Sequence, residues 1–428
     1  MHDIYVRDII NLCNGKLLNG NVDLVLGDFC TNTRKIKEND VYVGIRGEVF
    51  DGNKFYLDAI EKGASVCILD DVEADYKFGD ATVILVEDSV KCLQELAKYK
   101  RSLYDIPIIA VTGSVGKTST KDIIASVVGQ KYKTCKTIGN YNNHIGVPLT
   151  ILSLKDEEAL VVEMGMNHLR EIAVLSEIAK PTISVITNVG TAHIGILGSR
   201  DNILKAKLEI LEGMMIGSDV IINYDNDMLS SVVDELNDKY LVNTVGISSD
   251  AKYKAINIDE DVFSSKFDIE GISNDIKVNI GGDAFIYNSL VAYAIGDILG
   301  ISDKEIKNGI EIIDNNYLQH IDKYIGCSTQ YYIHCFDSVN VNKKLRSLRT
   351  RQNTYTIEDL ELPYALYMLG DYREAYRIYA KLLPLYWERQ RYILYFICRY
   401  NLWSIRHGVY DPKLDMILSS RSFEILGE

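Results

Sequence analysis

Long hydrophobic runs are missing from this sequence of 428 residues, and no run reaches the ~18 apolar residues of a membrane-spanning helix. The first residues also lack the apolar core of a secretion signal. The eight cysteines are too scattered to form a Cys-x-x-Cys metal or redox site. We therefore expect no membrane span, reduced thiols and a cytoplasmic protein.

Positive charge is scarce as well, because the chain carries a formal net charge of −14 at neutral pH. Such a balance argues against a nucleic-acid-binding protein. The charge is unevenly divided, with −17 on residues 1–330 and +3 on residues 331–428. The length suggests two to four domains, and the 47% of hydrophobic residues is enough for ordinary packed cores.

The most informative stretch runs from Ile108 to Thr120. Its apolar start predicts a short buried strand, a glycine-bearing turn follows, and a helix is expected near Lys117. A turn of small residues before a helix N-terminus suits phosphate binding. Lys117 would reach the β- and γ-phosphates, and the Thr118 hydroxyl would bind Mg²⁺. The predicted nucleotide-binding residues are Gly113, Ser114, Val115, Gly116, Lys117, Thr118 and Ser119.

Several polar residues follow predicted strands of the same region, where open α/β sheets place their ligands. Glu163 follows the strand 159–162, and taken alone it is equally compatible with a metal ligand and with a surface charge. His193 follows the strand 182–187 and alone is more typical of a structural histidine. By itself Lys207, on a predicted helix, is typical of a solvated lysine.

The first hundred residues alternate strands and helices. We predict strands at residues 40–45, 65–69 and 82–86, and a helix that Asp88 or Ser89 caps. The loop at residues 31–35 combines hydroxyls and a guanidinium, which suit a pyrophosphate, although a solvated turn is the commoner case.

Five motifs occur in one order along the chain, and together they resemble the ATP-dependent Mur ligases. The resemblance covers about residues 1–313. The N-terminal stretches 31–35 and 47–52 are most similar to members that join D-alanyl-D-alanine to a UDP-N-acetylmuramoyl peptide. The five motifs are Val111–Thr120, Gly139–Pro148, Glu163–Gly165, Asn188–His193 and Ala206–Ile210.

The resemblance implies an α/β fold with a UDP-substrate domain at residues 1–104 and a central parallel-sheet ATPase domain at residues 105–315. It implies ATP and Mg²⁺ as cofactors. It also implies a ligase of peptidoglycan precursor synthesis that phosphorylates a carboxylate and then joins it to an amine. No nucleic acid is expected as a partner.

The resemblance also implies roles for single residues. The expected Mg²⁺ ligands are Thr118, Glu163 and His193, and the expected catalytic groups are Lys117, His193 and a carbamylated Lys207. Asn288 falls on the adenine-contacting asparagine, although Tyr287 stands where histidine is usual. The expected substrate residues are Thr33, Arg34, Asn142 and Asn143, although Asn32 replaces a usual aspartate beside the first two.

The resemblance stops near residue 316, and residues 316–428 are expected to form an atypical helical tail in place of a third domain. Residues 364–379 look like a single tetratricopeptide-type hairpin, and residues 391–403 are apolar enough for a buried or partner-binding helix. Two alternatives therefore stay open. One is an ATP-binding relative without ligase turnover whose tail binds a protein partner, and the other is a Mur-type ligase that adds a different amino acid.

Overall fold

The computed structural model describes residues 3–47, 50–72, 78–260 and 264–313. The chain divides into two compact units, of which the first comprises residues 1–259, 266–278 and 283–313. The second comprises residues 260–265, 279–282 and 314–428. The expected helical tail, with its hairpin at residues 364–379, lies outside the described residues. Everything below concerns the first unit, apart from Glu260 and Ser265, which lie at the ends of two strands.

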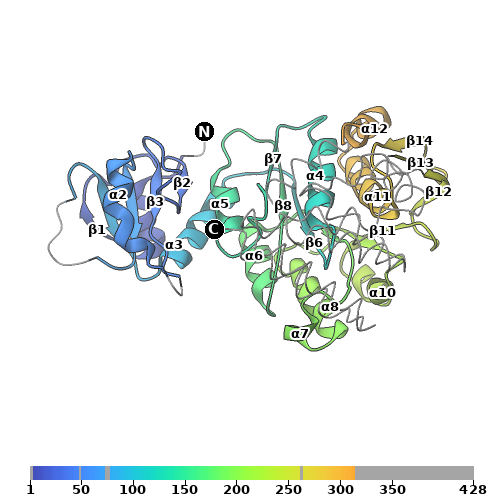
Figure 1. Cartoon of the computed structure of the whole chain (residues 1–428), viewed down its shortest axis with the longest axis horizontal. Coiled ribbons are helices and arrows are strands. Elements are labelled where there is room, and N and C mark those ends of the chain that lie inside the picture. Colours follow the sequence, from blue (N-terminus) through green and yellow to red (C-terminus); the bar gives the residue numbers. More distant parts are fainter. Residues whose placement is uncertain (1–2, 48–49, 73–77, 261–263, 314–428) are drawn as a thin grey trace, which may run out of the picture. The chain divides into compact units, whose positions relative to one another are not determined.

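The N-terminal part forms a five-stranded sheet in the order β1-β5-β4-β3-β2 (Figure 1). All neighbours run parallel except β1 and β5. The three predicted strands are confirmed, because short runs rich in β-branched residues are buried within the sheet. The strands are β1 (Lys16–Asn19), β2 (Phe29–Cys30), β3 (Val41–Val43), β4 (Val66–Leu69) and β5 (Thr82–Leu85).

Helices α1 (Val6–Cys13), α2 (Tyr56–Glu61) and α3 (Ser89–Ser102) accompany this sheet, with a 3₁₀ turn at Gly52–Phe55. The predicted cap of α3 is confirmed. The Asp88 carboxylate accepts hydrogen bonds from the first free N–H groups of the helix.

A second sheet has nine strands in the order β14-β13-β12-β11-β10-β9-β6-β8-β7. Across the sheet, each pair of neighbouring strands from β12 to β7 runs parallel. Its strands are β6 (Ile108–Thr112), β7 (Thr134–Lys136), β8 (Ala159–Glu163), β9 (Ile183–Ile186), β10 (Asp219–Asn223), β11 (Leu241–Gly246), β12 (Tyr253–Glu260), β13 (Ser265–Ile269) and β14 (Ser273–Val278).

The helices of this part fall into packed groups. Figure 1 shows α11 beside α4, and α12 also packs on α4, whereas α3 packs on α1, α5 and α6. None of the described helices is long and apolar enough to cross a membrane. The remaining helices are α4 (Lys117–Val128), α5 (Gly146–Leu152), α6 (Glu171–Ala179), α7 (Ile194–Leu197), α8 (Arg200–Leu208), α9 (Asp227–Ser230), α10 (Val233–Asn237), α11 (Asp283–Ile298) and α12 (Asp303–Glu311), with a 3₁₀ turn at Glu209–Leu211.

Strand β6 lies between β8 and β9, and all five of its residues are buried. After β6 the chain forms β7 and β8 on one side of that strand and then continues to β9 on the other side. This reversal brings the loops that follow β6, β8 and β9 to one edge of the sheet. Ligands of open α/β sheets bind at such an edge.

Candidate nucleotide and metal site

The loop between β6 and α4 has the backbone of a phosphate-binding turn. Gly113 and Gly116 adopt φ angles of +152° and +82°, which residues with a side chain rarely adopt. A Cβ atom on Gly113 would also collide with the Thr187 hydroxyl. The Lys117 ammonium donates to the carbonyls of Gly113, at 2.8 Å, and Ser114, at 3.4 Å, within its own loop. The predicted loop and the helix start at Lys117 are both confirmed.

The end of β9 fixes this loop from outside. The Asn188 carbonyl accepts from the Ser114 N–H at 3.0 Å, and its side-chain amide exchanges two hydrogen bonds with the Val115 backbone, each 3.0 Å long. The Thr187 hydroxyl donates to the Val115 carbonyl at 2.8 Å. Neither Thr187 nor Asn188 was predicted as a site residue. The available signal was a pair of polar residues directly after a buried strand.

Glu163 lies at the carboxyl end of β8 and is only 1% exposed. Its two carboxylate oxygens accept from the Thr118 hydroxyl at 2.9 Å and from the Asn142 amide at 2.8 Å. Its backbone N–H donates to the Thr137 hydroxyl at 3.0 Å. Glu163 is therefore not a surface charge, and the structure brings together three residues predicted from separate stretches of sequence.

The donor set around Glu163 fits a magnesium ion in part. Carboxylate and hydroxyl oxygens are the ligands that Mg²⁺ prefers, and those of Glu163 and Thr118 already lie within hydrogen-bond distance. Within the described ranges, no group of three histidine, cysteine, aspartate or glutamate side chains could hold a metal. A cation here would therefore need oxygen ligands from a bound phosphate or water.

His193 lies in the loop after β9, at the start of α7, with a φ angle of +65°. Burial lowers the pKa of its imidazole, and the charges of Lys207 and Lys117 lower it further. The imidazole is therefore neutral near pH 7, which leaves a ring nitrogen able to accept a proton or bind a cation.

Lys207 projects from α8 and is 1% exposed, so the solvated-lysine interpretation is wrong. Burial lowers its pKa to about 7, helped by the charge of Lys117 and opposed by Glu209. Glu209 is itself occupied, because its carboxylate accepts from the Arg170 N–H at 2.7 Å and the Ala173 N–H at 3.2 Å at the start of α6. Much of the Lys207 amine is therefore unprotonated near neutral pH.

Asn288, on α11, faces the helix that follows the phosphate loop. Its side-chain oxygen accepts from the Thr120 hydroxyl at 2.7 Å, whereas its side-chain nitrogen is buried and has no hydrogen-bond partner among the described residues. Leaving a buried amide donor unsatisfied is costly. The Asn288 nitrogen is therefore available to an acceptor atom of a ligand, such as a ring nitrogen of a nucleobase.

The other predicted substrate residues are not gathered with this group by any hydrogen bond within the described residues. Thr33 hydrogen-bonds to Asp58, whose pKa is held below its usual value by Lys62 and by this contact. The exposed Arg34 follows a turn in which its N–H donates to the Asn32 side chain at 2.9 Å. The exposed Asn143 side chain accepts from two N–H groups at the start of α5, at 3.1 and 2.8 Å.

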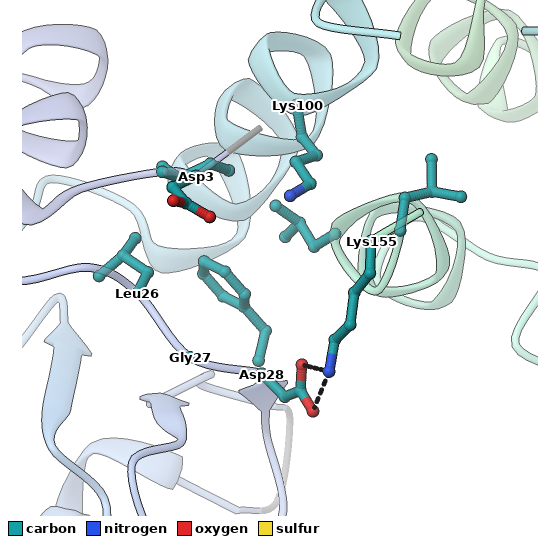
Figure 2. A pocket seen from close by; sticks show the side chains of 10 residues that line it. Asp3, Leu26, Gly27, Asp28, Lys100 and Lys155 are labelled. Carbon is teal, nitrogen blue, oxygen red and sulfur yellow. Dashed lines mark hydrogen bonds and ion pairs between the residues drawn. The ribbon is translucent and has the colours of Figure 1, made fainter. Parts of the chain in front are cut away.

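A cavity of about 310 Å³ lies elsewhere in the first unit and contains none of the predicted site residues (Figure 2). Figure 2 shows the Lys155 ammonium directed at both oxygens of Asp28, at 3.0 and 3.2 Å. These side chains are 62% and 56% exposed, so the pair contributes little stability.

The sheet, the phosphate loop after its central strand and the buried carboxylate beside that loop define an α/β nucleotide-binding protein. The profile of the Mur ligase middle domain matches residues 111–296. The UDP-N-acetylmuramoyl-tripeptide–D-alanyl-D-alanine ligase of Bacillus subtilis is 35% identical over 307 residues, which cover 71% of this chain and 66% of that protein. The chain thus spans just under two thirds of that relative's length.

The protein of the same name from Buchnera aphidicola subsp. Baizongia pistaciae is 30% identical over 335 residues, covering 76% of this chain and 72% of that protein. The crystal structure of MurF from Acinetobacter baumannii superimposes with a TM-score of 0.67 at 26% identity, covering 74% of this chain and 69% of that one. The chain belongs to the Mur ligase family.

Proposed function

We propose that this protein is an ATP-dependent ligase that joins D-alanyl-D-alanine to a UDP-N-acetylmuramoyl peptide in peptidoglycan precursor synthesis. The observation that carries the proposal is the meeting of the phosphate loop with Glu163 and Asn142, through the 2.9 Å and 2.8 Å hydrogen bonds at one edge of the sheet. The names of the relatives support the substrate pair.

In this proposal, the peptide carboxylate attacks the γ-phosphorus of ATP, and ADP leaves as the acyl phosphate forms. The amine of the dipeptide then attacks the acyl carbon, phosphate leaves, and the amine loses a proton. Lys117 would turn from its loop carbonyls to the phosphates and stabilise the charge of the transferred group. No covalent bond to the protein is needed.

Thr118 and Glu163 would hold Mg²⁺, with His193 as the third predicted ligand. Bound Mg²⁺ would supply positive charge to the phosphate oxygens. The neutral amine of Lys207 would react with carbon dioxide to give a carbamate and a proton. The carbamate would place an anion beside Lys117. Burial of Lys207 and its pKa near 7 support this step.

The remaining assignments of this proposal concern binding. Asn288 would contact adenine, and Thr33 and Arg34 would bind the uridine nucleotide. Asn142 and Asn143 would contact the UDP substrate beside Glu163. Residues 1–104 would form the substrate domain and residues 105–315 the ATPase domain, in agreement with the two separate sheets. We propose a cytoplasmic location, where these precursors would be used.

The alternative of an ATP-binding protein without ligase turnover is favoured by two observations. The Bacillus subtilis alignment covers only 71% of the chain, and no described residue is assigned to the incoming dipeptide. In that case, residues 316–428 would bind a protein partner. A ligase that adds a different amino acid is the other alternative.

One assay separates these functions, namely ADP release by the full-length protein with UDP-N-acetylmuramoyl tripeptide, with and without D-alanyl-D-alanine. The proposal expects ADP release that depends on both substrates, together with the ligated product in the mass spectrum. ADP release supported by another amino acid, but not by the dipeptide, would favour a different ligase. Nucleotide binding without turnover under any of these conditions would favour the non-ligase alternative.

A further inference from the structure

We propose that Tyr287 is a positioning residue for the nucleotide, because it ties the start of α11 to Asp225 and so fixes the amide of Asn288. This inference rests on the nucleotide site proposed above. Tyr287 departs from the usual residue of the family, and no step of the proposed reaction uses it.

The Tyr287 hydroxyl donates to the carboxylate of Asp225, which is itself held by backbone hydrogen bonds. Asp225 follows β10, and its oxygens accept from three consecutive N–H groups after β11, those of Ile247 at 2.6 Å, Ser248 at 3.1 Å and Ser249 at 2.7 Å. The Tyr287 hydroxyl donates to the same carboxylate at 2.7 Å. Burial alone would raise the pKa of Asp225, but these hydrogen bonds hold it well below its usual range. Asp225 is therefore an ionised acceptor for the tyrosine, held by several hydrogen bonds at once.

Adjacent residues of α11 make contacts in different directions. Tyr287 binds the loop after β10, and Asn288 binds Thr120 of α4, the helix that carries Lys117 and Thr118. Figure 1 shows α11 beside α4, in agreement with their extensive packing. The first turns of α11 are therefore held on one side by the sheet edge and on the other by the phosphate-loop helix.

This arrangement matters for the free nitrogen of Asn288. That nitrogen is buried and has no partner in the part of the chain that the structure describes, where its direction is set by the Thr120 hydrogen bond and by the position of the helix. Loss of the Tyr287 hydroxyl would let the helix start shift, and a displaced amide would form a weaker hydrogen bond with a ligand. Tyr287 therefore acts on the nucleotide through Asn288 and does not touch it.

The same helix offers a matched control. The Tyr293 hydroxyl donates to the Asp303 carboxylate at 2.7 Å, the same distance as in the Tyr287–Asp225 pair. Asp303 begins α12, whereas Asp225 lies at the strand edge where the nucleotide is expected. Tyr293→Phe therefore removes an equivalent hydrogen bond from the same helix without affecting the anchor near Asn288.

The test compares full-length wild type, Tyr287→Phe and Tyr293→Phe by calorimetric titration with ADP and Mg²⁺, by thermal melting and by the KM for ATP. We expect Tyr287→Phe to weaken ADP binding and raise this KM by roughly 3- to 10-fold, the effect of one hydrogen bond, with a smaller change in kcat. Tyr293→Phe should lower the melting temperature to a similar extent but change ADP affinity less than about 2-fold. Asp225→Asn, which weakens the same anchor, should change ADP affinity in the same direction as Tyr287→Phe.

ADP affinity unchanged from a tightly binding wild type in both phenylalanine variants would overturn the positioning role and leave the nucleotide site intact. Equal losses of affinity in both variants would also overturn it, because a general loosening of α11 would then explain the effect. Failure of wild type to bind ADP at all would refute the proposed nucleotide site, and this inference with it.

Discussion

Lys117 and Lys207 are two amines that lie in one mostly buried site. Burial lowers the pKa of both amines, and the charge of Lys117 lowers the pKa of Lys207 further. Both lysines also lower the pKa of His193 by charge repulsion. Apposed cations of this kind are unfavourable unless an anion enters. ATP phosphates would supply anions beside Lys117, and a carbamate at Lys207 would supply another. The residues are therefore arranged for a state that contains ligands.

The phosphate role of Lys117 is tested by Lys117→Ala. Among the described residues, the ammonium of Lys117 donates only to carbonyls of its own loop, so its loss should leave the fold intact. ADP release should fall by about 10² to 10³, the usual effect of removing a charge that stabilises a transition state. The control is Lys131→Ala, which removes a lysine that also donates to backbone carbonyls, those of Leu299 and Gly300. A folded Lys117→Ala variant with normal ADP release would refute the phosphate-loop assignment.

The buried amine of Lys207 predicts a pH-dependent stability. Its folded pKa of about 7 lies below the ordinary value of 10.5, so between these pH values the unfolded chain binds more protons. The free-energy cost of burying this lysine is therefore complete below pH 7 and decreases as the pH rises toward 10.5. Lys207→Met should exceed wild type in unfolding free energy at pH 6.5 by on the order of a few kcal/mol, and the difference should shrink at pH 9.5.

Urea unfolding at these two pH values, without nucleotide or bicarbonate, measures this difference. Adding bicarbonate at pH 8 should then stabilise wild type but not Lys207→Met, because only the wild-type amine can form a carbamate. A carbon-13 carbamate signal in wild type that is absent from the variant would identify the product. Identical responses of both proteins to bicarbonate would argue against carbamylation.

At the scale of secondary-structure elements, the strands around the site could be predicted from the sequence because they are short, apolar and buried. The strand predicted at residues 159–162 is observed as Ala159–Glu163, and that predicted at residues 182–187 as Ile183–Ile186. The hydrogen-bond partners of the polar side chains after these strands could not be predicted in this way. Asn188 supports the phosphate loop and Asp225 holds α11, contacts that depend on which strands become neighbours.

The local environment of single residues was equally hidden from sequence. Lys207 and a surface lysine have the same side chain, and only the packing of α8 shows that it is buried. From sequence alone Glu163 was open between a metal ligand and a surface charge, and the buried position at the end of β8 excludes the surface charge. The resemblance to a family filled this gap, because it carries information about tertiary structure that periodicity does not contain.

Asn143 illustrates the same limit and provides a prediction at the level of a helix end. Its side-chain oxygen accepts from the N–H groups of Ile145 and Gly146 at the start of α5, in the manner of a helix cap, whereas its predicted role in substrate binding would use the amide nitrogen. Asn143→Ala should lower the unfolding free energy by about 1 kcal/mol, as expected for the loss of a cap. Asn143→Asp keeps the acceptor oxygen and should keep the stability. If the amide nitrogen binds substrate, this variant should nevertheless raise the KM for the UDP substrate several-fold. An unchanged KM in Asn143→Asp would leave Asn143 as a helix cap alone.

At the scale of the whole molecule, the residues assigned to ATP, Mg²⁺ and the UDP substrate all lie before residue 314. They are distributed over a five-stranded and a nine-stranded sheet within one compact unit. The family resemblance implies a third domain that brings the incoming amine and closes over ATP, yet residues 316–428 do not resemble it. The step that depends most on the C-terminal residues should therefore be transfer to the amine rather than nucleotide binding.

The expectation that the C-terminal residues serve amine transfer rather than nucleotide binding is tested with a truncation after Asn315, beyond the end of α12 at Glu311. The truncated protein is compared with the full-length chain. The truncated protein should bind ADP and the UDP substrate within about 3-fold of wild type, since every assigned contact remains. Ligation of D-alanyl-D-alanine, followed by mass spectrometry, should fall by about 10² or more, because the amine is no longer held in place and water can reach the acyl phosphate. Circular dichroism and thermal melting should first establish that the truncated chain is folded. If the folded truncation ligates at the full-length rate, residues 316–428 take no part in the reaction, and the dipeptide must bind within the two sheets and their loops.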